Sequence, residues 1–411
     1  MMPSSPLWWR GARRVRNWAA ARGHPLKLPL RLPSAFITGS VGKTTTSSML
    51  THILCADGLR VALVTTEWAC LQPPQGLPRI IRRGDSANCR FATDVLASAP
   101  ADAAVFELAR GGLIKRGMWF DRCTVSAVLN IGDNHLGLDG IETREDMARV
   151  KLGAALPARR LVVLNADDPL CLAMRDTLTP RQFGLVSPSG DITRLDAIRQ
   201  PGESFAWLTP GTGESLHVAL PGEEILTWPT AALPATLNGL YRPAAVNALF
   251  AILLAVGLGV PLVRALNALE SFESTAEQNP ARMNVITGKP WQMILTTVDG
   301  PVPVAALAEY ARNVAVTGRR LLVLTTTDDR PDDFIRSTAA AAVDGGFDFY
   351  FCADYLPLRS RAPLVAATLL AEGLREAGVA AENIRILPDT RTAQALAETF
   401  AAPGDLLIVA Q

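Results

Sequence analysis

Residues 36 to 50, with the sequence FITGSVGKTTTSSML, constrain the fold more than any other part of the chain. An apolar, β-rich run leads into the loop GSVGKT at residues 39–44, and a helical pattern follows that closes at Gly58. A strand, a glycine-containing loop and a helix in this order direct backbone N–H groups and a helix N-terminus at an anion. A full Walker A loop has a further glycine five residues before Gly42, where this chain has Ile37. The sequence therefore predicts a shortened phosphate-binding loop.

Two kinds of side chain in this loop suit a nucleoside triphosphate with magnesium. The Lys43 ammonium would neutralise charge on the β- and γ-phosphates, and the hydroxyl of Thr44 or Thr45 would reach Mg²⁺. The alternative is a chance Gly-Lys-Thr in a surface turn, which the strand before it and the helix after it disfavour. We therefore expect ATP and Mg²⁺ as cofactors. The residues predicted to bind the nucleotide from this stretch are Gly39, Ser40, Val41, Gly42, Lys43, Thr44 and Thr45.

Along the rest of the chain, apolar β-rich runs alternate with helical patterns, which is typical of parallel sheets in an α/β fold. A polar, proline-bearing segment at 274–284 separates two such sections and is the expected boundary. We expect three parts, which are a basic extension over 1–33, a central domain over 34–280 and a smaller domain over 281–411. Strands are expected at 34–38, 60–66, 102–109, 125–132 and 159–165, then at 291–297, 319–326, 347–353, 384–388 and 404–410, with a buried helix at 242–259.

Composition limits the class of protein and its setting. A chain of 411 residues with 49% hydrophobic and 19% charged residues is long enough for two or three domains with their own cores. Six scattered cysteines show no CxxC pair and no metal-ligand spacing, so we expect a reducing cytoplasm. No run of about twenty apolar residues could span a bilayer. We expect no nucleic-acid partner.

The first 33 residues carry seven basic residues and no acidic one. Trp8, Trp9 and Trp18 stand among the arginines, so this segment could lie on an anionic membrane surface. A short terminal helix packed on the rest of the protein or on a partner is the alternative that we prefer, because a single short amphipathic segment binds membranes weakly.

Polar side chains follow two other expected strands. The run 102–109 delivers Glu107, and the run 125–132 contains Asn130 and is followed by Asp133 and His135. Each of these alone could be a capped turn or an ordinary histidine. Because ligands of open α/β sheets bind outside the carboxyl ends of the strands, these side chains together with the phosphate loop are predicted to bind Mg²⁺ and phosphate.

The segments TGSVGKTTT, VLNADDP, NPARMN and PGDLLIVA, together with the long run from Glu107 to Lys151, resemble the Mur ligase family. The similarity is strongest to the Mur-ligase-like C-terminal half of cyanophycin synthetases and runs from about residue 34 to the C-terminus. Only 33 residues precede it, so we expect the ATP-grasp half of those proteins to be absent. The resemblance implies a P-loop central ATPase domain with a parallel sheet, and a Rossmann-like C-terminal domain that closes over the cleft.

The resemblance also assigns roles to individual residues. Lys43 and Thr44 match the family's triphosphate and Mg²⁺ contacts, and Glu107 matches a Mg²⁺-binding glutamate. His135 matches a histidine at a second Mg²⁺, and Lys151 stands where many members carry a carbamylated lysine. An ordinary exposed lysine is the alternative for Lys151. Asn247 and Arg282 match family positions that line the adenine and the phosphate side of the nucleotide.

The chain departs from the family pattern at three positions. Asn134 stands where an acid is usual, Thr296 stands at the usual Asp of the DYAHNP loop, and Asp299 stands at its histidine. We expect Asp299 to bind a cationic acceptor amine or an extra Mg²⁺ in a working ligase, and to be merely tolerated in an inactive one. Residues kept from the family's second domain are Asp328 and Arg330, while Arg359 and Arg361 echo an RGR element.

The resemblance implies an ATP-dependent carboxylate–amine ligase that forms ADP and phosphate through an acyl phosphate. Its substrates would be an amino acid or a small peptide-like carboxylate and an amine, with a partner biosynthetic enzyme or a homo-oligomer as further expectations. One alternative is a catalytically reduced nucleotide-binding subunit of a larger biosynthetic complex, and another is an ATPase or GTPase switch. The residues expected to act in catalysis are Lys43, Glu107, His135, Lys151, Asp299 and Arg330. Asp328 is a further residue expected to bind the cofactor. The residues expected to bind the metal are Thr44, Glu107, His135 and Lys151.

Overall fold

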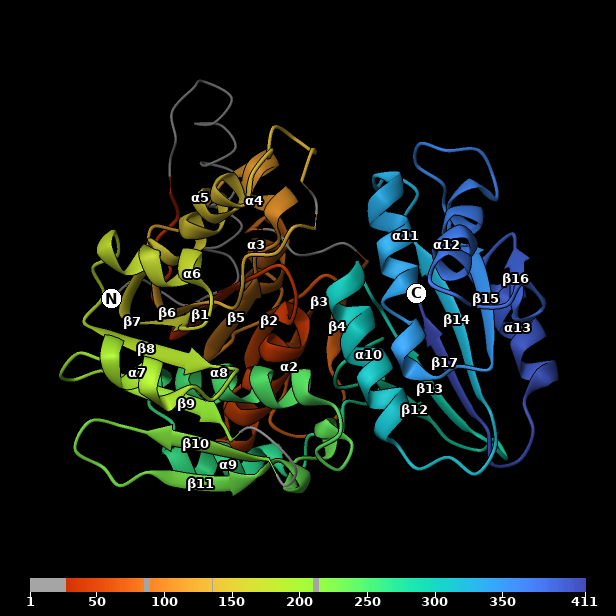
Figure 1. Ribbon diagram of the computed structural model, residues 1–411. Helices are drawn as coiled ribbons and strands as arrows, with labels where there is room; N and C mark the ends of the chain where they lie inside the picture. The colour runs from red at the N-terminus through yellow and green to blue at the C-terminus, as the bar shows by residue number, and fades with distance from the viewer. Residues whose placement is uncertain (1–26, 85–88, 135, 210–213) are drawn as a thin grey trace. The chain divides into compact units, whose positions relative to one another are not determined.

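The computed structural model describes residues 27–84, 89–134, 136–209 and 214–411 (Figure 1). These residues form two compact units. The first unit comprises the described residues up to Gly239 together with Pro243–Glu273, and the second comprises Leu240–Arg242 and Ser274–Gln411. In the described part of the chain, no helix is both long and apolar enough to cross a bilayer.

The first unit is built on a mixed sheet whose strand order among the described residues is β11-β10-β9-β8-β7-β6-β1-β5-β2-β3-β4. The seven strands from β9 to β2 in this order pair in parallel, and an antiparallel hairpin extends the sheet at each end. The strands are β1 (Ser34–Thr38), β2 (Val61–Val64), β3 (Trp68–Gln72), β4 (Arg79–Arg83), β5 (Ala103–Glu107), β6 (Cys123–Val128), β7 (Ala158–Asn165), β8 (Gln182–Ser187), β9 (Ser204–Leu208), β10 (Ser215–Ala219) and β11 (Leu226–Pro229).

The five strands expected from apolar runs are confirmed as β1, β2, β5, β6 and β7. The strands β3 and β4 were not expected. The sequence of β4 is RIIRR, and it follows a proline- and glycine-containing turn, so it reads as a charged loop. Edge strands tolerate charge because one of their sides faces water.

Helices cover both faces of this sheet. Val162 belongs to a core that contains Phe36 of β1 and Met147 of a flanking helix. Its neighbour Leu161 faces the opposite side, since successive strand residues alternate. There Leu161 lies so close to Gly257 that a Cβ on that glycine would lie 2.7 Å from it. The helices are α2 (Lys43–Ala56), α3 (Cys89–Leu96), α4 (Arg110–Arg116), α5 (Arg144–Ala155), α6 (Pro169–Ala173), α7 (Ile192–Ile198), α8 (Arg242–Leu258) and α9 (Leu262–Leu269).

The packed part of the first unit begins before Ser34, where the sequence placed the start of the central domain. Leu28 and Leu30 are buried in the core, and the Leu28 N–H donates to the Trp119 carbonyl at 2.7 Å. Residues 27–33 are therefore part of this unit, because alternate apolar residues let an extended segment bury one side. The expectations about Trp8, Trp9 and Trp18 lie outside the described residues.

The second unit contains a smaller sheet with the order β12-β13-β17-β14-β15-β16, parallel except for β12. All five strands expected in this part of the chain are present, and the short β12 is additional. The strands are β12 (Asn284–Ile286), β13 (Gln292–Thr296), β14 (Arg320–Thr326), β15 (Phe349–Asp354), β16 (Ile384–Leu387) and β17 (Leu406–Ala410). The helices are α10 (Pro301–Asn313), α11 (Asp332–Ala340), α12 (Val365–Glu376) and α13 (Thr390–Phe400).

Candidate active site

The shortened phosphate loop connects β1 to α2, and β1 lies between β6 and β5 (Figure 1). Gly42 precedes the first residue of α2 with φ at +86°, a left-handed conformation that favours glycine. A Cβ at Gly42 would lie 2.4 Å from Oδ1 of Asn247 in α8. The same oxygen accepts a hydrogen bond from the Thr46 hydroxyl at 3.3 Å. The structure therefore brings Asn247, predicted from the sequence, directly against the loop.

Asn130, which follows β6, holds the loop from the side. Its Oδ1 accepts from the N–H groups of Ser40 at 2.8 Å and Val41 at 2.9 Å, and its Nδ2 donates to the Val41 carbonyl at 3.2 Å. The expectation that Asn130 is a Mg²⁺ or phosphate ligand is therefore not supported, because its amide already binds the loop. The N-terminus of α2, where backbone N–H groups point out of the helix, is the part of the loop that suits an anion.

Ser40 connects three parts of the site. Its hydroxyl accepts from the Gly132 N–H at 2.8 Å. Its carbonyl accepts from Nζ of Lys43 at 3.1 Å and from Nδ2 of Asn134 at 3.5 Å. An amide at position 134 can donate to this carbonyl, whereas an ionised acid has only acceptors. The departure at Asn134 therefore fits its surroundings in this chain.

Glu107, at the end of β5, is buried and holds the Thr44 side chain. The Thr44 hydroxyl donates to Oε2 of Glu107 at 2.9 Å. Thr66, just beyond β2, donates its hydroxyl to Oε1 at 2.7 Å and its N–H to Oε2 at 3.1 Å. Four neighbouring strands, β6, β1, β5 and β2, thus end in groups that meet around the loop.

The Thr44 hydroxyl and the Glu107 carboxylate are oxygen ligands of the kind that Mg²⁺ binds. Magnesium in nucleotide sites is usually bound by one or two protein oxygens, with phosphate oxygens and waters completing its shell. The described residues contain no group of three or more His, Cys, Asp or Glu that could hold a metal by themselves. Thr44 and Glu107 therefore fit Mg²⁺ that arrives with a nucleotide. His135, the predicted ligand of a second Mg²⁺, lies outside the described residues.

Lys151 lies in α5 and is only 2% exposed. This helix begins at a capping box that Thr143 and Asp146 form. Burial holds the pKa of Lys151 well below its usual value, and the charges of Lys43 and Arg110 lower it further. The alternative of an ordinary exposed lysine is therefore wrong, and the side chain lies within electrostatic range of the phosphate loop.

In the second unit, two predicted residues pair with each other. Nη2 of Arg330 donates to both carboxylate oxygens of Asp299, at 2.9 and 3.1 Å. Arg330 is 4% exposed and Asp299 is 35% exposed. Asp299 thus already has a cationic partner, which the sequence did not reveal. Thr296 is buried at the end of β13, where its carbonyl accepts from the Gln411 N–H at 2.9 Å.

Asp328 holds a loop in place. Its buried carboxylate accepts from the N–H groups of Arg359, Ser360 and Arg361 at 2.7 to 3.0 Å. Burial alone would raise the pKa of Asp328, but these three donors outweigh it and leave the pKa below its usual value. The N–H groups of this loop already bind both carboxylate oxygens, so the geometry does not favour the predicted contact between Asp328 and a cofactor. Arg282 binds neighbouring backbone, donating to the Ala281 carbonyl at 2.9 Å.

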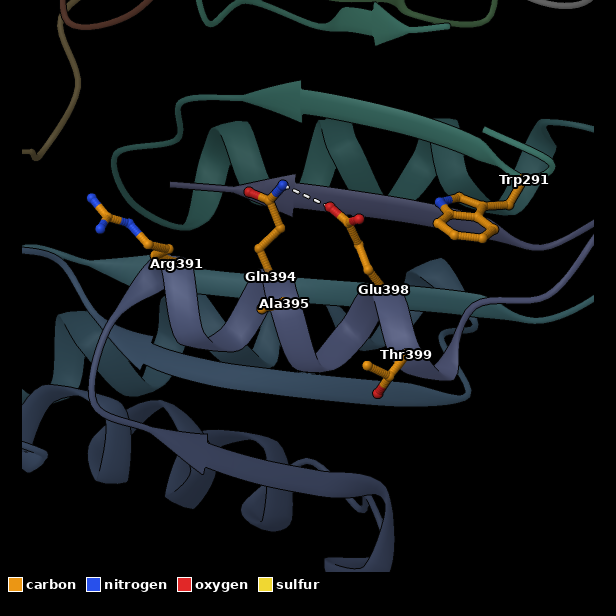
Figure 2. A pocket seen from close by; sticks show the side chains of 6 residues that line it. All are labelled: Trp291, Arg391, Gln394, Ala395, Glu398 and Thr399. Atoms are coloured by element: carbon orange, nitrogen blue, oxygen red, sulfur yellow. Dashed lines mark hydrogen bonds between the residues drawn. The ribbon is translucent and has the colours of Figure 1, made fainter. Parts of the chain in front are cut away.

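A hollow of about 450 Å³ lies on the second unit beside α13 (Figure 2). Glu398 there accepts from Nε2 of Gln394 at 2.9 Å and from Nζ of Lys289 at 2.7 Å. None of the predicted site residues is among its lining residues, which are Trp291, Arg391, Gln394, Ala395, Glu398 and Thr399. The hollow is therefore separate from the candidate active site.

Sequence reasoning missed Thr66 and the role of Asn130. Both follow parallel strands, at the edge of the sheet where ligands bind. Applying the same rule to the run 60–66 would have found Thr66. The contacts of Asn130 carry no local signal, because its partners lie about ninety residues away along the chain.

The loop, the buried Thr44–Glu107 pair and the four strand ends around them define a phosphate-loop protein of the α/β class. Residues 37–234 match the Mur ligase middle domain, so this part of the chain belongs to the Mur ligase family.

Relatives and solved structures agree with this membership. The chain is 30% identical over 373 residues to cyanophycin synthetase of Crocosphaera subtropica, covering 89% of this chain and 41% of that protein. It therefore spans about two fifths of the length of that relative. It is 26% identical to UDP-N-acetylmuramoyl-L-alanyl-D-glutamate--2,6-diaminopimelate ligase of Thermosynechococcus vestitus, covering 91% and 70% of the two chains. The bifunctional folylpolyglutamate synthase/dihydrofolate synthase of Yersinia pestis shares the fold, with a TM-score of 0.64, 21% identity and coverage of 97% and 90%.

Proposed function

We propose that this protein is an ATP-dependent carboxylate–amine ligase that releases ADP and phosphate. The observation that carries the proposal is the buried contact between Thr44 of the phosphate loop and Glu107, at 2.9 Å. A hydroxyl and a carboxylate at this place suit a nucleoside triphosphate with its magnesium. The relatives, which are named as a synthetase and a ligase, support the reaction class. We place this activity in the cytoplasm.

In the proposed first step, a substrate carboxylate oxygen attacks the γ-phosphorus of ATP. The bond from that phosphorus to the bridging oxygen breaks, which gives an acyl phosphate and ADP. Lys43 and the first N–H groups of α2 hold the phosphates and stabilise the charge that develops on them. Bound Mg²⁺ would neutralise further phosphate charge, and Thr44 and Glu107 are the residues that would hold it.

In the proposed second step, an amine attacks the acyl carbon and forms a tetrahedral intermediate. The intermediate collapses when phosphate leaves with the electrons of the carbon–oxygen bond, and the amine nitrogen loses a proton. Positioning and electrostatics supply most of the rate, so no protein nucleophile is required. An amino acid or a small peptide-like metabolite is the substrate class that we propose, with a partner biosynthetic enzyme or self-association as further proposals.

We also propose that Lys151 is carbamylated. Its lowered pKa favours the neutral amine, whose lone pair attacks the carbon of CO₂ while the nitrogen loses a proton. The product carries a carboxylate in place of a buried neutral amine. Such a group would add an oxygen ligand near the phosphate loop for a second magnesium, with His135 as its predicted neighbour.

Phosphate release tests the reaction. The purified protein is incubated with ATP, Mg²⁺ and panels of carboxylates and amines, and phosphate and amide products are measured together. Release that depends on an amine acceptor supports the ligase. Nucleotide binding without any release would favour the alternative of a non-catalytic subunit, which the departures at Asn134, Thr296 and Asp299 motivate. Phosphate release at the same rate with and without an acceptor amine would favour an ATPase or GTPase switch.

The substitution Asp299→Asn should raise the KM for the acceptor amine by about threefold to tenfold and leave the KM for ATP unchanged. The asparagine removes the carboxylate that holds the Arg330 guanidinium, so the two loops that carry these residues lose their ion pair. Steady-state kinetics over a panel of amines and Mg²⁺ concentrations gives both constants.

The matched control is Asp333→Asn, because Asp333 is fully exposed in the same unit and faces Arg336 at 3.4 Å. We expect this control to behave as the unmodified protein. An active Asp299→Asn enzyme whose acceptor and Mg²⁺ dependence match those of the control would rule out a role for Asp299 at the acceptor.

A further inference from the structure

The peptide of Ile131 is held by two charged side chains, one in α5 and one just before α6. Its N–H donates to Oδ2 of Asp168 at 2.7 Å. Its carbonyl accepts from Nη2 of Arg144 at 2.7 Å and from Nε at 3.2 Å. Both polar groups of this one residue are therefore bound by ionised partners, and such hydrogen bonds are stronger than neutral ones.

The same segment touches the phosphate loop on its other side. Asn130, the residue before Ile131, accepts from the N–H groups of Ser40 and Val41. Gly132, the residue after it, donates its N–H to the Ser40 hydroxyl at 2.8 Å. Residues 130–132 thus form a short bridge between the phosphate loop and the pair Arg144 and Asp168.

The two side chains are themselves well anchored. Asp168 is 9% exposed and precedes α6, where its Oδ1 accepts from the N–H groups of Leu170 at 3.0 Å and Cys171 at 3.4 Å. Arg144 is the first residue of α5, whose start is fixed by the Thr143 capping box. Nη2 of Arg144 lies 4.0 Å from Oδ1 of Asp168. Each side chain therefore starts from the capped beginning of a helix and reaches the same peptide.

We infer that Arg144 and Asp168 are positioning residues for the phosphate loop. They act through the Ile131 peptide, which sets where Asn130 and Gly132 hold Ser40 and Val41. Because Lys43 donates to the Ser40 carbonyl, a displaced loop would also displace the lysine. The inference rests on the nucleotide-binding part of the proposed function and does not require the ligase reaction.

The test compares Arg144→Met with Arg149→Met in the full chain. Methionine keeps much of the apolar stem and removes the donors to Ile131. Arg149 lies in the same helix, is 74% exposed and pairs with Asp146 at 2.6 Å, so its replacement controls for loss of one arginine from α5. Arg144→Lys keeps the charge with fewer placed donors, and Asp168→Asn keeps the size of the other partner.

The measurements are the Kd of Mg-ADP by calorimetry, the thermal midpoint, and amide hydrogen exchange at residues 39–42. For Arg144→Met we expect about tenfold weaker binding of Mg-ADP and faster exchange at Ser40 and Val41. Arg144→Lys and Asp168→Asn should lie between it and the unmodified protein. The thermal midpoint should match that of Arg149→Met, because a merely structural loss would lower stability without a selective effect on the loop.

Equal Mg-ADP affinity and equal exchange in Arg144→Met and Arg149→Met would overturn the inference. If Arg144→Met does not fold, Arg144→Lys and Asp168→Asn decide in the same way. If the unmodified protein binds no nucleotide, the proposed function fails, and exchange at residues 39–42 still decides whether Arg144 and Asp168 position the loop.

Discussion

Replacing Lys43 by alanine lowers ATP-dependent product formation by at least about a thousandfold while the fold is retained. Nζ of Lys43 donates to the Ser40 carbonyl of the phosphate loop at 3.1 Å, and the proposed function has this lysine bind the phosphates. Catalysis of phosphoryl transfer depends mainly on positioning and charge, so removing this cation removes a large part of it. Phosphate release measures the loss of activity, and circular dichroism on the same preparation shows whether the fold is retained.

Lys115→Ala is the matched control for this change. Lys115 lies in α4, is 68% exposed and is 3.9 Å from Asp139, so its loss removes one lysine from the same unit without touching the loop. We expect it to retain full turnover. A folded Lys43→Ala protein that turns over ATP as fast as Lys115→Ala would show that the loop does not serve the reaction.

Replacing Lys151 by methionine removes activity and stabilises the fold. The activity is lost because methionine cannot form a carbamate. In buffer stripped of CO₂ the stability rises, because folding no longer has to bury an amine that the unfolded chain holds protonated, and we expect this to add roughly 1 to 3 kcal/mol to the free energy of unfolding at neutral pH. Turnover assays and denaturant unfolding measure the two effects separately.

The pH dependence of stability follows from the direction of the pKa shift. The folded pKa of Lys151 lies well below its unfolded value of 10.5, so the unfolded chain binds more protons between these two values. Stability should therefore rise as the pH increases through this window, and the destabilisation should be fully present below the folded pKa. Lys151→Met should remove this rise, whereas Lys115→Met should keep it.

Carbon dioxide provides an independent check on the carbamate. Protein stripped of CO₂ should lose activity and regain it when bicarbonate is added, and Lys151→Met should respond to neither treatment. If stripping leaves the rate unchanged and Lys151→Met stays active, Lys151 has no carbamate role. Activity that is lost only in the variant would point to the lysine itself.

The sequence predicted the phosphate loop well because all of its determinants are local. A strand, Gly42 and a helix stand next to each other in the chain, and each has a recognisable pattern. The contacts that hold this loop could not be predicted in the same way. Asn130 and Asn247 reach it from about ninety and two hundred residues away, so only the folded sheet brings them together.

The second unit shows the same limit for charged residues. Asp299 and Arg330 were each identified by position, but their pairing depends on the ends of β13 and β14, which β17 separates. Asp328 was predicted at the cofactor because it matches a residue of the family's second domain. Its carboxylate instead binds three consecutive N–H groups of a loop whose turn no pattern in the sequence indicated.

The position of β17 in the sheet affects how the second unit folds during synthesis. β17 pairs with β13 on one side and with β14 on the other, yet it follows both in the chain by most of the unit's length. Synthesis proceeds from the N-terminus at about 5–20 residues per second. The strands of the first unit, and then β13 and β14, are therefore made before residues 406–410. Until then β13 and β14 have unpaired, apolar edges that neighbouring nascent chains could bind. The speed at which the segment between β14 and β17 is translated should therefore affect the yield of folded protein.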